Sequence, residues 1–168
     1  MTIIRNYDEV IDAQAVGVLI AETYRKFNLD FASPAEQEKL LGPFFYAWSA
    51  DPAHQASIKR VLKAHMVFVA EDGDQIVGVL RCRPGRLQSL FVREDHHRQG
   101  IGRRLADCCD QVSASQEARN ITVAAAPYAI SFYTAVGYKK STGLRNGWSF
   151  EGRGLIYQPM KKVLPGQG

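Results

Sequence analysis

The residues of this chain that are best suited to bind an anion lie in the turn Arg98-Gln99-Gly100-Ile101-Gly102-Arg103. This turn separates a segment with strand character from a segment with helical periodicity. The first amides of a helix have no acceptor within the helix, and the helix dipole adds positive potential at the same end. Gly100 and Gly102 would let a phosphate approach the backbone closely, and Arg98, Arg103 and Arg104 add positive charge. The segment therefore predicts a phosphate-binding turn.

Two common phosphate-binding motifs do not describe this turn. The third glycine of the dinucleotide-binding fingerprint is missing, and so is the Gly-Lys-Ser/Thr sequence of a Walker loop. Glycines before a helix also occur where two backbone segments pack tightly. The turn alone thus leaves tight packing open as an alternative to phosphate binding.

The elements around the turn predict a mixed α/β fold with helices on the faces of a sheet. Asp8 is a predicted helix N-cap, and Pro34 and Pro127 suit the first turn of a helix. Turns at 71–74 and 84–85 separate three runs rich in apolar residues, which predicts three successive antiparallel strands. We expect helices near 9–27, 34–41, 44–48, 55–63, 101–115 and 127–136, and strands near 2–5, 66–70, 75–83, 86–92, 120–125, 138–142 and 154–160.

Two of these helices have a predicted core-facing side. The side predicted for the first helix comprises Ile11, Ala15, Val18, Leu19 and Glu22. The side predicted for the helix after the glycine turn comprises Ile101, Leu105, Cys108, Cys109 and Val112. Both cysteines are thereby explained as small apolar core residues rather than as nucleophiles.

The strand, turn and helix around Gly100 resemble motif A of the GNAT superfamily of N-acetyltransferases. That motif is a strand, then (Gln/Arg)-x-x-Gly-x-(Gly/Ala), then a helix. Leu90-Phe91-Val92 matches the end of the strand, and Gly100 and Gly102 match the two small residues.

A second motif of the same superfamily follows at the expected distance. Pro127-Tyr128-Ala129, then Phe132-Tyr133, then Gly137-Tyr138 are similar to motif B. The region of resemblance runs from about Met66 to about Tyr138, and the two motifs together are far more specific than either alone.

The resemblance implies one acetyltransferase domain over residues 1–168. It implies a mixed, mostly antiparallel central sheet of six to seven strands, flanked by about four helices and splayed at the cofactor site. It also implies an acyltransferase that moves an acetyl group from acetyl-CoA, as co-substrate, to a primary amine by direct attack, with no metal. The residues that it assigns to the cofactor are Leu90, Phe91, Val92, Arg98, Gln99, Gly100, Ile101, Gly102 and Arg103.

Each of these residues has an implied task. The backbone of Leu90, Phe91 and Val92 would pair with the pantetheine arm, and the amide of Leu90 or a neighbour would polarise the thioester carbonyl. The amides of the glycine turn would hold the pyrophosphate. Tyr133 matches the tyrosine that donates a proton to the departing CoA sulfur, although its place beside Phe132 is also typical of a core residue.

The sequence departs from the superfamily pattern at two places. His97 stands where Gln or Arg is usual, and Ala124 to Ala126 fill a stretch where many members have Asn or Ser. The pyrophosphate contacts are mainly backbone amides, which any residue supplies. Both departures could weaken cofactor binding or alter the pose of the cofactor.

The sequence identifies neither a single general base nor a single acceptor. Glu22, His65 and Glu151 are candidate bases, and a chain of waters is an alternative to all three. The segments expected to contact the acceptor are 24–48 and 144–157, and Arg145 to Trp148 is predicted to be a turn or hairpin tip. The aromatic residues of the first segment could line an acceptor pocket or form core beneath short helices; they are Phe27, Phe31, Phe44, Phe45, Tyr46 and Trp48.

The composition argues against several other classes of protein. A net charge of +4 and a pI of about 9.0 favour an anionic ligand in general, but no basic run interleaved with aromatic residues predicts nucleic-acid binding. No apolar run approaches the roughly 18 residues of a membrane span, and the N-terminus does not resemble a signal peptide. Three cysteines, of which two are adjacent, predict neither a disulfide framework nor a zinc site. We expect His96 and His97 to be solvated loop residues.

These observations describe a cytoplasmic protein without a membrane partner. The expected partner is a small-molecule or peptide amine, and a homodimer is left open. The alternative from another functional class is a non-catalytic module that binds acyl-CoA and regulates a partner.

Overall fold

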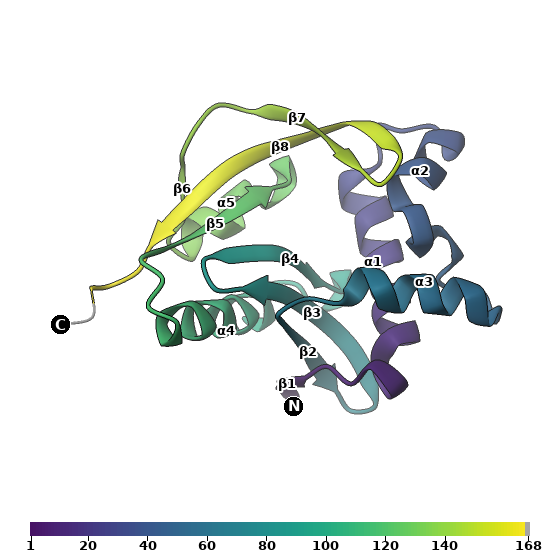
Figure 1. Cartoon of the computed structure of the whole chain (residues 1–168), viewed down its shortest axis with the longest axis horizontal. Coiled ribbons are helices and arrows are strands. Elements are labelled where there is room, and N and C mark those ends of the chain that lie inside the picture. The colour runs from purple at the N-terminus through teal and green to yellow at the C-terminus, as the bar shows by residue number, and fades with distance from the viewer. Residues whose placement is uncertain (167–168) are drawn as a thin grey trace.

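Eight strands form one sheet in the computed structural model, which describes residues 1–166 (Figure 1). The strands are β1 Thr2–Asn6, β2 Met66–Asp72, β3 Gln75–Arg83, β4 Arg86–Val92, β5 Asn120–Ala125, β6 Lys139–Lys140, β7 Arg145–Ser149 and β8 Gly152–Val163. The α-helices are α1 Glu9–Asn28, α2 Pro34–Leu41, α3 Pro52–Leu62, α4 Ile101–Ser115 and α5 Ile130–Ala135, and the 3₁₀ turns are η1 Gly42–Tyr46, η2 Glu94–His96 and η3 Pro127–Ala129. The predicted fold class is confirmed, with eight strands and five α-helices in the described part of the chain.

The sheet is mostly antiparallel, as expected. Its strand order is β1-β2-β3-β4-β5-β8-β6, and β7 pairs with β8 beside this path. Only β4 and β5 run parallel among the described strands, and they meet at the single register position Arg86 opposite Thr122. The amide of Thr122 also donates to the carbonyl of Gly85 at 3.0 Å. Beyond this point the two strands separate, which leaves the sheet open next to the end of β4.

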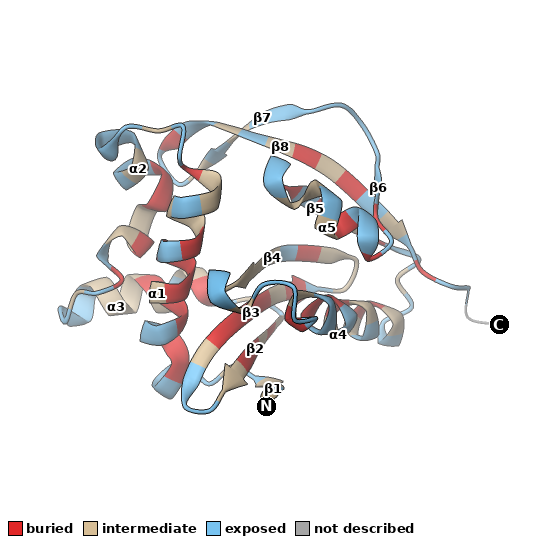
Figure 2. Ribbon diagram, turned by 180° about the vertical axis from the view of Figure 1, so that it is seen from behind, coloured by how far each residue is buried: buried red, intermediate tan, exposed pale blue. Residues whose placement is uncertain are grey.

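Helices cover both faces of the sheet and enclose a core on each side. α1 packs on β3 and β4 on one face, and α4 packs on the same strands on the other. Val69 and Val79 belong to the core beneath α1, whereas Ala70 and Leu80 belong to the core beneath α4, because successive strand residues face opposite sides. Figure 2 shows buried residues along α1 and along the central strands. None of the helices within residues 1–166 is long and apolar enough to cross a membrane.

The helix α1 begins as predicted but presents a different side to the core. The carboxylate of Asp8 accepts the amide of Val10 at 2.9 Å, which confirms the N-cap. The predicted core side is confirmed only at Leu19, which is buried, and at Val18, which is partly buried. It is wrong at its other members, since Ile11 is 69% exposed and Ala15 and Glu22 are exposed as well. The buried residues of this helix are Asp12, Ala13, Val16, Gly17, Leu19, Ile20, Ala21 and Thr23.

A buried ion pair and a close contact set the rotation of α1. The Asp12 carboxylate accepts two bonds from the Arg5 guanidinium, at 2.8 and 2.9 Å, so this acidic residue lies inside rather than outside. A Cβ at Gly17 would lie 3.2 Å from Cγ2 of Ile58, which shows how closely α3 approaches α1 there. Neither partner lies within α1, so apolar periodicity could not reveal this rotation.

The helix α4 matches its prediction. Ile101, Leu105 and Cys109 are buried, and Cys108 and Val112 pack partly buried against the same core. All three cysteines are free thiols, and Cys82 of β3 lies in this core as well. The cysteines therefore serve packing, as expected.

The strands β7 and β8 form a hairpin that arches from the β5 side of the sheet to α2 (Figure 1). At its tip, the Ser149 hydroxyl donates to the carbonyl of Leu40 at 2.7 Å. The prediction of a turn at Arg145 to Trp148 is wrong, because these residues form β7 and the chain reverses at Phe150, where φ is 55°. Gly147 suggested a turn, but a Cβ there would lie 2.8 Å from Cε1 of Tyr157, so this glycine admits a ring from the neighbouring strand.

Candidate active site

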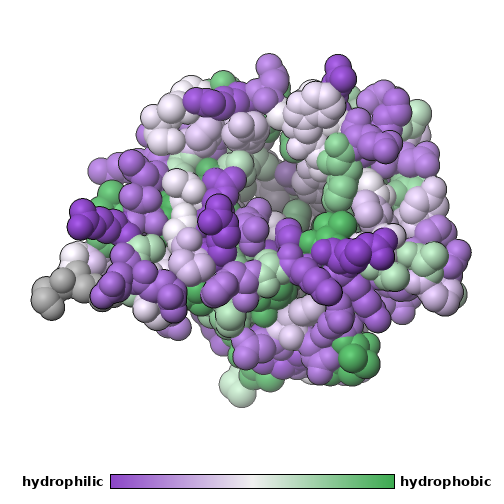
Figure 3. Space-filling model, in the orientation of Figure 1, coloured by the Kyte–Doolittle hydropathy of each residue, from purple (hydrophilic) through white to green (hydrophobic). Residues whose placement is uncertain are grey.

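Two cavities open where β4 and β5 separate, and they share four lining residues. The first cavity has a volume of about 410 Å³ and lies between the glycine turn, the end of β4 and the η3–α5 segment. The second has a volume of about 520 Å³ and lies between β4, β5 and the β7–β8 hairpin. Figure 3 shows the molecule hollowed between this hairpin and β4. The residues that line both cavities are Leu90, Tyr128, Ala129 and Tyr133.

The glycine turn forms one wall of the first cavity. Gly100 is the N-cap of α4 with φ of 81°, and a Cβ there would meet no atom within 4 Å. Because Gly100 has no side chain to cap the helix, the amides of residues 100–103 find no acceptor within the described part of the chain. A helix start with unsatisfied amides facing a cavity can receive the oxygens of a phosphate.

The second glycine of the turn also permits a close packing contact. A Cβ at Gly102 would lie 3.0 Å from Cε2 and 3.2 Å from Cζ of Phe132. The ring of Phe132 thus packs directly on the first turn of α4. This contact ties the glycine turn to the residue that precedes Tyr133.

The residues assigned to the cofactor lie in different places around the two cavities. Arg98, Gly100, Gly102 and Arg103 line the first cavity, together with Val92. Phe91 lines only the second cavity, and Leu90 lines both. The remaining two, Gln99 and Ile101, line neither cavity.

The arginines of the turn are not equally available to a ligand. The guanidinium of Arg104 donates to the carbonyl of Thr2 at 2.9 Å and does not line the cavity. That of Arg103 donates to the carbonyl of Ala135 at 3.3 Å while still lining the cavity. Arg98 lines the cavity with φ of 61°. Two of the three predicted cations, Arg98 and Arg103, therefore face the first cavity.

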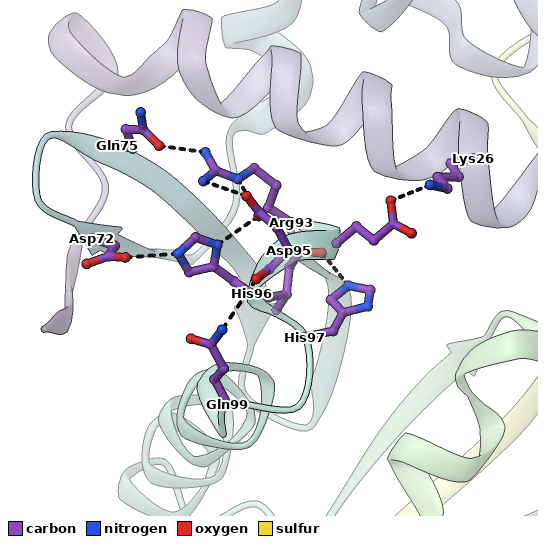
Figure 4. Close-up of polar contacts among 10 residues, drawn as sticks. Lys26, Asp72, Gln75, Arg93, Asp95, His96, His97 and Gln99 are labelled. Atoms are coloured by element: carbon purple, nitrogen blue, oxygen red, sulfur yellow. Dashed lines mark hydrogen bonds and ion pairs between the residues drawn. The ribbon is translucent and has the colours of Figure 1, made fainter.

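His96 is not the solvated loop residue that we predicted. Its Nδ1 lies 2.8 Å from Oδ1 of Asp95, its Nε2 lies 2.9 Å from Oδ2 of Asp72, and its side chain is only 13% exposed (Figure 4). The hydrogen bonds that the imidazole donates to these two carboxylates raise the pKa of His96. The imidazole thus joins the β2–β3 hairpin to the loop that leads into the glycine turn.

His97 also has a defined place. Its Nε2 lies 2.7 Å from the carbonyl oxygen of Val92, an interaction that Figure 4 draws as a dashed line. Its ring centroid lies 5.4 Å from that of Phe27. The ring of Phe27 in turn stacks on that of Tyr128 at 5.2 Å. Three aromatic side chains from α1, the loop after η2 and η3 thereby line one side of the first cavity.

The second cavity is aromatic and uncharged. Its aromatic lining residues are Tyr24, Phe91, Tyr128, Tyr133, Trp148 and Tyr157. Its other polar side chains are Asn28, Gln88, Ser89 and Asn146. Within residues 1–166, no Asp, Glu, Lys, Arg or His lines it. Burial raises the pKa of Tyr128 to about 12, so this phenol stays neutral at physiological pH.

Tyr133 stands where the two cavities meet. It is 6% exposed, and burial is the main reason that its pKa lies well above the ordinary value for tyrosine. Its ring makes edge contacts with Phe132 at 5.1 Å and Tyr138 at 5.4 Å between centroids. The interpretation of Tyr133 as a core residue is confirmed, and the same residue lines both cavities, while its role as an acid stays a prediction.

The remaining predicted residues divide between the site and the rest of the fold. Glu22, His65 and Glu151 line neither cavity, so no predicted base reaches the site in this structure. Of the six aromatic residues in segment 24–48 that we named, Phe27 lines the first cavity and none lines the second. Phe44 is buried core. Both segments nevertheless contribute to the second cavity, through residues that we did not name individually, such as Tyr24 and Tyr157.

This chain resembles known proteins both in sequence and in fold. Residues 12–164 match the sequence model of a family described as an acetyltransferase (GNAT) domain. No curated protein matches the chain. Among solved structures, a GCN5-related N-acetyltransferase from Rhodopseudomonas palustris has 21% identity and a TM-score of 0.70, with 98% of this chain and 96% of that chain covered.

Two further structures were solved with a ligand. The PaiA N-acetyltransferase from Thermoplasma acidophilum, in complex with coenzyme A, has 14% identity and a TM-score of 0.70, with 97% and 99% of the two chains covered. The protein yncA from Salmonella typhimurium, solved with acetyl-CoA, has 16% identity and a TM-score of 0.63, with 100% and 96% covered. At these identities the likeness establishes a shared fold over the whole length.

Proposed function

Because this chain belongs to the GNAT acetyltransferase family, we propose that it is an N-acetyltransferase that moves an acetyl group from acetyl-CoA to a primary amine. The observation that carries this proposal is the position of Tyr133, which lines both cavities at once. The first cavity would hold the cofactor, the second would hold the amine, and the acetyl group would pass between them beside Tyr133.

The first cavity suits coenzyme A by its chemistry. The free amides of residues 100–103 offer donors to a pyrophosphate, and Arg98 and Arg103 supply positive charge. The apolar wall formed by Phe27, Val92 and Phe132 suits the pantetheine arm. PaiA and yncA were solved with coenzyme A and acetyl-CoA, which supports the same ligand for this chain.

The open edge of β4 suits an extended ligand. β4 pairs with β5 only at Arg86, so the backbone of Leu90, Phe91 and Val92 has no strand partner on that side among the described residues. An amide-bearing arm can pair with such an edge as an additional strand would. The carbonyl of Val92 already accepts from His97 at 2.7 Å, so this histidine must turn aside if the arm pairs there.

Tyr133 would act as the general acid. Acetyl-CoA supplies the activated acetyl thioester, and Tyr133 would donate its phenolic proton to the departing sulfur. Its raised pKa keeps the phenol protonated at neutral pH. The amine would attack directly, because the cysteines are placed in the core and line neither cavity.

The proposal is tested first by thermal unfolding with acetyl-CoA, CoA, adenosine diphosphate and a panel of unrelated anions. A ligand that binds only the folded state raises the melting temperature by mass action. We expect a clear rise with acetyl-CoA and CoA, and then release of free thiol when a primary amine is added. No rise at millimolar acetyl-CoA would overturn the proposal.

The same assay separates the enzyme from the non-catalytic module. A domain that only binds acyl-CoA would show the rise in melting temperature but no thiol release with any amine. Release that depends on the amine, and that Tyr133→Phe reduces without loss of CoA binding, supports catalysis.

A further inference from the structure

We propose that the second cavity accepts a monoamine with an aromatic or apolar body and no second charged group. This inference rests on the proposed function, since it concerns the acceptor of the same reaction. It would separate this chain from acetyltransferases that act on polyamines, aminosugars, lysine-rich peptides or free amino acids.

The first argument is the lack of a counter-charge. Across residues 1–166, the polar side chains that line this cavity, apart from its tyrosines and Trp148, are two asparagines, one glutamine and one serine. A second ammonium placed there would lose hydration without gaining an ionic partner, and such burial is costly. An α-carboxylate would also lose hydration without gaining an ionic partner, because no cationic side chain lines the cavity.

The second argument is the aromatic wall. Tyr24 of α1 meets Phe91 of β4 edge to face, with centroids 6.0 Å apart. Trp148 and Tyr157 come from opposite strands of the β7–β8 hairpin and face the same space. Flat rings around a cavity favour a ligand that is itself flat or apolar, and they also tolerate a single ammonium through cation–π contact.

Two arginines of the β7–β8 hairpin lie next to lining residues, although neither lines the cavity itself. The guanidinium of Arg153 lies over the ring of Trp148, 4.3 Å from its centroid. Arg145 stands opposite Tyr157 in the hairpin. These two cations offer a polyamine no attractive partner at the hairpin wall.

The third argument concerns the proton on the amine. In the part of the chain that the structure describes, no carboxylate and no imidazole lines the second cavity, so no side chain there can take a proton from an ammonium. An amine that loses its proton to water before it reacts needs no such side chain, and an uncharged amine on an apolar body suits this cavity. The charge of the walls and the lack of a base lead to the same class of substrate.

The experiment measures kcat/KM for thiol release with two matched pairs of amines. Hexylamine is compared with 1,6-diaminohexane, which adds only a second cation, and tyramine is compared with tyrosine, which adds only a carboxylate. We expect the monoamine of each pair to be preferred by about tenfold or more. Equal or better rates with diaminohexane or tyrosine would overturn the inference, and so would a lack of turnover with both monoamines when acetyl-CoA binds.

A variant tests the cause of the preference. Gln88→Glu places one carboxylate on the exposed wall of the cavity and should reverse the preference between hexylamine and diaminohexane. Gln111→Glu makes the same change at an exposed position of α4 outside both cavities and should leave the preference unchanged. An unchanged preference in Gln88→Glu would contradict the electrostatic explanation.

Failure of the inference and failure of the proposed function are distinguishable. If acetyl-CoA does not raise the melting temperature of the unmodified protein, the acetyltransferase proposal fails and the inference fails with it. If acetyl-CoA binds and thiol is released fastest with a diamine or an amino acid, only the inference fails.

Discussion

The Nε2 atom of His96 lies 2.9 Å from Oδ2 of Asp72, and this contact joins two segments that are 24 residues apart in the sequence. Asp72 ends β2, whereas His96 ends the η2 turn that leads to Gly100. The other ring nitrogen faces Asp95 at 2.8 Å, so the imidazole can satisfy both carboxylates only when both nitrogens carry a proton. The charged form of His96 therefore holds the segment that leads to the glycine turn in place.

This arrangement predicts a pH-dependent contribution to stability. The folded-state pKa of His96 is raised, so its contribution is complete below about pH 6.5 and is lost as the pH rises through the folded-state value. We expect the difference in melting temperature between the unmodified protein and His96→Gln to shrink between pH 6 and pH 9. His54→Gln is the matched control, because His54 faces the Ser49 hydroxyl and no carboxylate. A difference that stays constant with pH would contradict the charged contact.

Tyr133→Phe should separate catalysis from binding. The ring and its packing are kept, so the stability and the affinity for CoA should hardly change, while kcat should fall by about 10²-fold. Tyr138→Phe is the control, because the Tyr138 hydroxyl is buried without a described partner and lines neither cavity. Steady-state thiol release at several pH values checks the prediction. An unchanged rate in Tyr133→Phe at every pH would show that another group or water protonates the sulfur.

Gly100→Glu should abolish binding of CoA. A carboxylate would occupy the space in front of the free amides, and its charge would repel the pyrophosphate; we expect Kd to rise by about 100-fold or more, or about 2.7 kcal/mol. Gly85→Glu is the matched control, because Gly85 also has a positive φ, of 77°, at the other end of β4. Calorimetric titration with CoA compares the two variants. Equal affinities in both would place the pyrophosphate elsewhere.

Asp12→Ala should destabilise the fold without touching either cavity. The carboxylate is 4% exposed and binds both Arg5 and the amide of Asp8, so its loss should lower the free energy of unfolding by about 3 kcal/mol. Asp12→Asn should cost less, since its amide oxygen can still accept the Asp8 amide. Chemical denaturation with urea measures both.

The Arg5–Asp12 ion pair should lose its contribution to stability at low pH. Burial alone would raise the pKa of Asp12, but the bonds from Arg5 and the Asp8 amide outweigh it and lower the pKa overall. The pair therefore contributes fully to the free energy of unfolding above about pH 4. This contribution is lost as the pH falls through the lowered pKa of Asp12. The difference in free energy of unfolding between the unmodified protein and Asp12→Ala should accordingly shrink as the solution becomes more acidic. A difference that grows as the pH falls would contradict this assignment.

Local signals predicted most of the elements and the turn at the centre of the site. Asp8, Pro34 and Gly100 act on the backbone within one turn of a helix, so their effects can be predicted without knowledge of distant residues. The same holds for the apolar side of α4, because Ile101, Leu105 and Cys109 repeat at helical spacing over an uninterrupted stretch. The sequence alone thus determined that a glycine turn opens α4, which is the place where we propose that an anion binds.

Contacts between distant segments decided the rest. The rotation of α1 depends on Arg5 and Ile58, which lie outside the helix, and the burial of His96 depends on Asp72. The second cavity exists because β5 leaves β4 after one pair and because the β7–β8 hairpin reaches across to α2. Its uncharged lining comes from α1, β4, β5, the η3–α5 segment, β7 and β8, which no single stretch of the sequence contains. Only packing of the whole chain brings them together, because side-chain proximity across a fold depends on burial and register rather than on local propensity.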